Sequence, residues 1–118
     1  MMIRTQNYAK QAYPLVAYMQ RSGIEEKYRT LALTFPTMIM QNGLSQAIGF
    51  LMAKDKPEHG EILRHIAKLL NYQDGYSLHE AILKSDIIEY QLLTRNSIDA
   101  ASWLKRYTQA LLEKALKG

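Results

Sequence analysis

A helical run of apolar residues, interrupted by two helix breakers, constrains the fold of this chain more than any other feature. Positions i, i+3, i+4, i+7 and i+11 are occupied by Tyr28, Leu31, Ala32, Phe35 and Ile39, and the same spacing returns in Leu44, Ala47, Ile48 and Leu51. Pro36 lacks the N–H that a helix would donate to residue 32, and Asn42 with Gly43 readily adopts positive φ. We therefore expect a bend at both places and a buried helical corner. Whether Pro36 bends one helix or separates two stays open.

Helical spacing continues through the rest of the chain, with no strand-like alternation between hairpin turns. The pattern predicts an all-α fold: one compact domain over 1–118, a bundle of about five to seven helices with a long C-terminal helix. The expected helices are about Thr5–Arg21, a second from Ile24 to the Pro36 bend, Leu44–Ala53, one beginning near Pro57, Ser77 to about Lys84, and one or two helices over Ser85–Lys117. Ser77 and Glu80 have the spacing of a capping box.

Composition excludes several classes of site. The 118 residues contain no cysteine, which rules out disulfides, zinc ribbons, iron–sulfur ligation and thiol catalysis. No run reaches about 18 apolar residues and no secretory leader is recognisable at the N-terminus, so we expect a cytoplasmic protein without membrane association. Lys and Arg exceed Asp and Glu by 15 to 11, a mild excess that permits contact with phosphates without requiring it.

Few residues are suited to proton chemistry. His65 lies one helical turn after Glu61, so an imidazole and a carboxylate could point the same way, and His59 is nearby. His79 falls on another element, and the three histidines have no metal-ligand spacing. The sequence also lacks a phosphate-binding glycine loop and a nucleophile elbow. We therefore expect no catalysis, no metal and no cofactor, with a hydrolase using His65 and Glu61 as the remaining enzymatic alternative.

Basic residues give a better functional lead, because several Lys or Arg can bind a nucleic-acid backbone without proton chemistry. The candidate contacts to an RNA backbone are Lys54, Lys56, Arg95, Lys105 and Arg106. Each of them also suits an ordinary solvated face, and Arg95 can pair with Asp99 at i,i+4.

Two large aromatic residues near the C-terminus, Trp103 and Tyr107, lie at the edge of the predicted core arc. Amphipathic aromatic side chains in such a position often anchor a partner, so both are candidates for a subunit interface. They can equally cover the N-terminal helix. Tyr90 falls closer to the core arc.

Two segments of the chain resemble a known family. The runs Lys27–Leu33, Phe35–Ile39 and Asn42–Leu51 are similar to the small, all-helical subunit family of the Cmr-type (type III-B) CRISPR RNA-silencing effector complex. Tyr90–Arg95 and Ala100–Tyr107 resemble the C-terminal helix of that family. The two stretches cover less than half of the chain.

The resemblance implies a small subunit without nuclease activity. Its expected partners are the other Cmr effector subunits, chiefly the backbone subunit along which it stacks, together with guide RNA and target RNA, and weak self-association is also expected. From the residues alone, two alternatives remain: a helix-turn-helix DNA-binding regulator that uses Ser77–Lys84, and a generic helical adaptor.

Overall fold

The computed structural model describes residues 4–112, and every regular element in that range is a helix. The elements are α1 (Arg4–Ala17), α2 (Glu25–Asn42), α3 (Leu44–Lys54), α4 (Pro57–Leu69), α5 (Gly75–Lys84) and α6 (Ile87–Leu111). The prediction of an all-α fold with a long last helix is confirmed.

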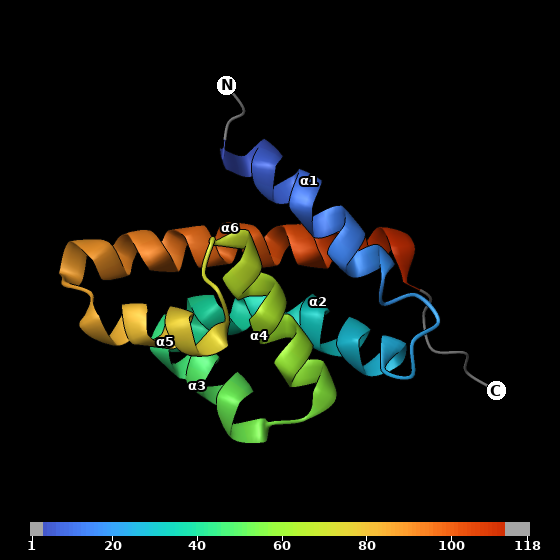
Figure 1. The fold of residues 1–118 in the computed structure, drawn as a ribbon, viewed down its shortest axis with the longest axis horizontal. Coiled ribbons are helices and arrows are strands. Elements are labelled where there is room, and N and C mark those ends of the chain that lie inside the picture. The colour runs from blue at the N-terminus through green and yellow to red at the C-terminus, as the bar shows by residue number, and fades with distance from the viewer. Residues whose placement is uncertain (1–3, 113–118) are drawn as a thin grey trace.

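Helix α6 organises the fold. It spans the molecule in Figure 1, and its main packing partners are α1 and α2, which come from the first half of the chain. Ser97, Ala100, Ala101, Leu104 and Thr108 on its inner face are buried. Helix α4 packs against both α2 and α3.

The predicted helical corner lies between α2 and α3. Pro36 is buried inside α2, and the helix continues through it to Asn42, so Pro36 does not separate two helices. The chain turns from α2 into α3 at Gly43, where φ is +87° and the N–H donates to the carbonyl of Ile39 at 2.9 Å. Pro36 cannot donate the backbone hydrogen bond of a regular helix, and the complete burial of its apolar neighbours Phe35 and Ile39 offsets that loss.

Helix boundaries differ from the sequence prediction most clearly at the end of α1 and the start of α5. α1 ends at Ala17 rather than Arg21, and a series of turns follows in which Met19 and Gln20 donate to carbonyls three residues back. α5 begins at Gly75 because Asp74, not Ser77, is the N-cap: its carboxylate accepts from the N–H of Ser77 at 2.8 Å. The predicted capping box is therefore wrong.

Helix α6 is one continuous helix and shows no break near Asn96 and Ser97. It starts at a capping box in which Asp86 accepts from the N–H of Glu89, and the carboxylate of Glu89 accepts from the N–H of Asp86. The helix ends at Leu111, with Leu112 as an extended C-cap, so the prediction is wrong at Leu112, and its part over 113–117 lies outside the described residues. Tyr90 is half-buried, and its hydroxyl accepts from the N–H of Ser45 at 3.0 Å, which ties α6 to the start of α3.

The core includes the two stripes that the periodicity predicts, together with buried residues of α1, α5 and α6. All the residues of the α2 and α3 stripes are buried, and Ile62, Ile66 and Leu69 of α4 join them. Within residues 4–112 no helix has both the length and the apolar character needed to cross a membrane.

Candidate functional site

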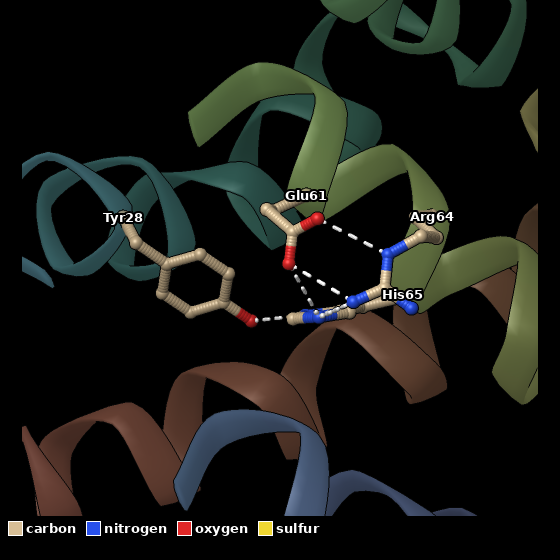
Figure 2. A network of polar contacts seen from close by, with 4 residues as sticks. All are labelled: Tyr28, Glu61, Arg64 and His65. Carbon is tan, nitrogen blue, oxygen red and sulfur yellow. Dashed lines mark hydrogen bonds and ion pairs between the residues drawn. The ribbon is translucent and has the colours of Figure 1, made fainter. Parts of the chain in front are cut away.

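Four polar side chains of α2 and α4 form one connected network (Figure 2). The hydroxyl of Tyr28 lies 2.8 Å from Nδ1 of His65, and Nε2 of His65 lies 3.4 Å from a carboxylate oxygen of Glu61. Arg64 donates to both oxygens of that carboxylate, from Nε at 3.1 Å and from Nη2 at 3.0 Å. Glu61 and His65 point the same way because residues four apart share a face of α4.

The surroundings fix the charge of each group. Burial lowers the pKa of His65 to about 4, against the opposing effect of the Glu61 carboxylate, so the imidazole is neutral at neutral pH. The hydrogen bond from Arg64 lowers the pKa of Glu61, and burial raises that of Tyr28. Nη2 of Arg64 also lies 3.3 Å from Nε2 of His65, and the position of the single proton on the neutral ring sets the direction of each bond. With the proton on Nδ1 the ring donates to the Tyr28 hydroxyl and accepts from Arg64 at Nε2, whereas with the proton on Nε2 it accepts from the hydroxyl at Nδ1.

This arrangement is better suited to holding two helices together than to proton transfer. His65 is only 1% exposed, and both of its ring nitrogens already face partners. A general base has to come within hydrogen-bond reach of the proton it removes. A substrate would therefore have to displace Tyr28 or Glu61 to reach the imidazole.

The other two histidines lie elsewhere. His59 is buried at the start of α4, where Nδ1 is 3.4 Å from Glu58 and the ring packs edge-on against Phe50 at 5.3 Å. His79 is half-buried on α5. Among the described residues, no three His, Asp or Glu side chains are grouped as metal ligands would be.

The two candidate interface aromatics lie together on α6. Trp103 and Tyr107 are both half-buried, with ring centroids 5.7 Å apart. Tyr107 also contacts Tyr13 of α1 edge-on at 5.3 Å, and the guanidinium of Arg106 lies 5.6 Å from the centre of the Trp103 ring. We call Tyr13, Trp103, Arg106 and Tyr107 the aromatic cluster. It joins α1 to α6, so these aromatic residues cover the N-terminal helix, and it leaves Tyr13 half exposed.

The five candidate cations do not form one surface. Arg95, Lys105 and Arg106 lie on α6, whereas Lys54 ends α3 and Lys56 precedes α4. Figure 1 shows the α3–α4 connection on the opposite side of the fold from α6. Lys54 lies 5.8 Å from the centre of the Phe50 ring, and Arg106 is the cation of the aromatic cluster.

The segment considered for DNA recognition is α5. Its one cation, Lys84, pairs with Glu80 at 3.0 Å, and Tyr76 and Leu83 are its large exposed apolar residues. A recognition helix is expected to present several donors to base edges and phosphates, which α5 does not do.

Sequence reasoning assigned Tyr28 only to an apolar stripe and missed its contact with His65. The hydroxyl itself was the available signal, because a buried tyrosine usually has a hydrogen-bond partner. The partner lies 37 positions away in the chain, on a helix that no local pattern places next to α2.

Three comparisons with known proteins agree. The family described as CRISPR-associated protein (Cas_Cmr5) matches residues 4–111. The CRISPR system Cmr subunit Cmr5 of Thermus thermophilus is 36% identical over 114 residues, which cover 97% of this chain and 100% of the relative. The crystal structure of a Cmr5 family protein from the same organism superposes with a TM-score of 0.92 at 36% identity, covering 96% of this chain and 100% of that one.

Proposed function

Since this chain belongs to the Cmr5 family of CRISPR-associated proteins, the small subunits of the Cmr (type III-B) complex, we propose that it works in the cytoplasm as a non-catalytic subunit that stacks along the backbone subunits and supports the binding of guide RNA and target RNA. The match over residues 4–111 is the observation that carries this proposal, because it includes all six helices. Other Cmr subunits are accordingly its partners, and weak association between copies of the chain is part of the proposal.

The aromatic cluster is the proposed contact with a neighbouring subunit. Trp103 and Tyr107 retain exposed surface although they already pack against Arg106 and Tyr13. Such preordered aromatic side chains lose little conformational entropy when a partner covers them, which favours their use as anchors.

Contacts with the RNA backbone are the proposed role of the scattered cations. Lys54, Lys56, Arg95 and Arg106 are exposed, and Lys105 is partly exposed. Their separation on two sides of the fold suits a subunit that touches a long RNA at several places better than a compact binding pocket. Sequence recognition is then left to base pairing between guide and target.

We also propose that the chain has no catalytic activity of its own. The support for this proposal is the enclosure of His65, whose ring nitrogens face Tyr28 and Glu61. Purified chain, free of contaminating nuclease, is expected to leave single-stranded RNA intact. RNA cleavage that His65→Ala abolishes would contradict this part of the proposal.

The experiment for the subunit role is co-purification. The chain is tagged and expressed with the other Cmr subunits and guide RNA, and the proteins and RNA that it retains are measured. We expect the backbone subunit and guide RNA to be recovered with it, and less of both with Trp103→Ala. Tyr76→Ala is the matched control, because Tyr76 is an exposed aromatic residue on α5, away from the cluster. Recovery of the chain alone would reject the proposal.

A further inference from the structure

A groove lies between α1 and α4, and its lining includes neither the aromatic cluster nor any of the five candidate cations. It has a volume of about 730 Å³ and opens to solvent. On the α1 side its wall is one stripe at i, i+4, i+7 and i+11, formed by Asn7, Gln11, Pro14 and Tyr18. On the α4 side, Arg64 and Lys68 lie one turn apart. The groove therefore follows from two helical stripes that face each other.

The charge of the groove is positive. Lys10, Arg64 and Lys68 line it, and no carboxylate is among its lining residues in the described part of the chain. Glu61 offsets the charge of Arg64 by binding it through two hydrogen bonds. Two exposed lysines, one on each wall, are left to attract an anion.

Arg64 is also held in place. Its guanidinium is fixed on Glu61, whose carboxylate faces His65, and His65 is fixed by Tyr28 from the core (Figure 2). An arginine whose position is set before binding loses less conformational freedom when it contacts a phosphate. The buried network thus positions one wall of the groove.

Tyr18 supplies an aromatic face at the end of the groove. Its side chain is 83% exposed, the most exposed of the large apolar and aromatic residues in residues 4–112. Asn7 and Gln11, which hydrogen-bond to each other at 3.2 Å, add polar amide groups to the same wall. An exposed aromatic ring beside cations is the combination that binds single-stranded nucleic acid, because a base stacks on the ring while the cations contact phosphates.

We propose that this groove binds a short segment of single-stranded RNA, with phosphates on Lys10, Lys68 and Arg64 and an unpaired base stacked on Tyr18. The volume suits one nucleotide together with its phosphates, since sites for small ligands measure about 300–1,000 Å³. A duplex keeps its bases stacked inside the helix and cannot offer one to Tyr18. The inference rests on the proposed function, which supplies the RNA. The residues of this site differ from the five candidate cations Lys54, Lys56, Arg95, Lys105 and Arg106.

The test measures binding of a fluorescently labelled single-stranded RNA of mixed sequence to the isolated full chain at low salt. Lys10→Gln combined with Lys68→Gln is compared with Lys27→Gln combined with Lys84→Gln. The two pairs remove the same charge from exposed lysines, and only the first pair lines the groove. We expect the first pair to weaken binding about tenfold more than the second and to reduce the log–log salt slope by about 1.4, at about 0.7 for each lost contact.

Stacking is tested at Tyr18. Tyr18→Ala is expected to weaken RNA binding about tenfold, whereas Tyr18→Phe is expected to retain binding because the ring remains. Tyr76→Ala, at a similarly exposed tyrosine outside the groove, is expected to leave binding unchanged. Unaltered binding in the groove variants, no binding by the unsubstituted chain, or equally tight binding of duplex RNA or free AMP would each overturn the proposal. Co-purification with the Cmr subunits separates the two proposals, because Lys10→Gln with Lys68→Gln is expected to keep the chain in the complex.

Discussion

The hydroxyl of Tyr28 lies 2.8 Å from Nδ1 of His65, and this contact joins α2 to α4 inside the core. Both side chains are fully buried, and the same imidazole faces Glu61 through its other nitrogen. Through Glu61 the contact also extends to Arg64 at the protein surface. The network thus connects the interior of the bundle with the groove that we propose for RNA.

The first prediction concerns the hydroxyl. Tyr28→Phe leaves Nδ1 of His65 buried without a partner, so the free energy of unfolding is expected to fall by about 1–3 kcal/mol. Urea denaturation followed by circular dichroism measures the change. Tyr76→Phe removes a hydroxyl from an exposed ring and is expected to change stability by less than about 0.5 kcal/mol. Equal stability of the two variants would show that the buried bond contributes nothing.

The second prediction is a pH dependence. The pKa of His65 is about 4 in the folded protein, against 6.5 for an ordinary histidine, so the unfolded chain binds a proton that the folded chain excludes between these values. Stability is therefore expected to fall as the pH drops from 6.5 toward 4, by up to about 3 kcal/mol from this group. Because the pKa of Glu61 is also lowered, its own contribution is lost at lower pH, below the ordinary range of a carboxyl group.

Unfolding free energies measured between about pH 7 and about pH 4.5 test the assignment to His65. His65→Gln is expected to flatten the profile, and His79→Gln, at a half-buried histidine on α5, to leave it steep. A profile that His65→Gln does not alter would assign the effect to another group.

The third prediction compares two glycines. Gly75 is buried at the start of α5, and a Cβ there would lie 2.5 Å from Cγ and Cδ2 of Leu63. Gly75→Ala is expected to destabilise the protein by about 1–3 kcal/mol, because Leu63 has to move out of its place against the core. Gly60→Ala places its Cβ in open space inside α4 and is expected to stabilise by about 0.5–1 kcal/mol. Thermal melts of both variants give the signs, and the same sign for both would contradict the packing argument.

The fourth prediction concerns the start of α6. Asp86→Ala removes the carboxylate that accepts from the N–H of Glu89 and is expected to cost about 1 kcal/mol of stability. Ser85→Ala, one position earlier, removes a hydroxyl that donates to the carbonyl of Ile82 and leaves the capping box intact. We expect the smaller loss there, measured by the same denaturation. A larger loss from Ser85→Ala would mean that the end of α5, not the cap of α6, limits stability at this junction.

Part of the fold could be predicted from local sequence because the signals are short-ranged. Apolar residues repeating at 3.6-residue spacing identified the buried faces of α2 and α3, and Pro57 marked the first residue of α4. Ser77 failed as a predicted cap because Asp74 has the stronger acceptor and comes three residues earlier. The two competing caps could not be ranked without the turn that precedes α5.

The candidate sites depended much less on local pattern. The sequence identified Glu61 and His65 as neighbours because residues four apart lie on one face of a helix, here α4. Trp103 and Tyr107 have the same spacing on α6. The contact of Tyr107 with Tyr13 joins helices from opposite ends of the chain, and the apolar periodicity of neither helix predicts it.

The sequence by itself determined that the chain forms a series of helices and which sides of α2 and α3 are buried, because both depend on spacings of three and four residues and on the backbone properties of Gly and Pro. Only the tertiary structure decided that α2 continues through Pro36, that Tyr28 meets His65, and that Lys10 faces Lys68 across a groove. Those relationships depend on which buried faces pack together and at what angle. The packing of the whole core determines these pairings and angles, so no short segment of the sequence predicts them.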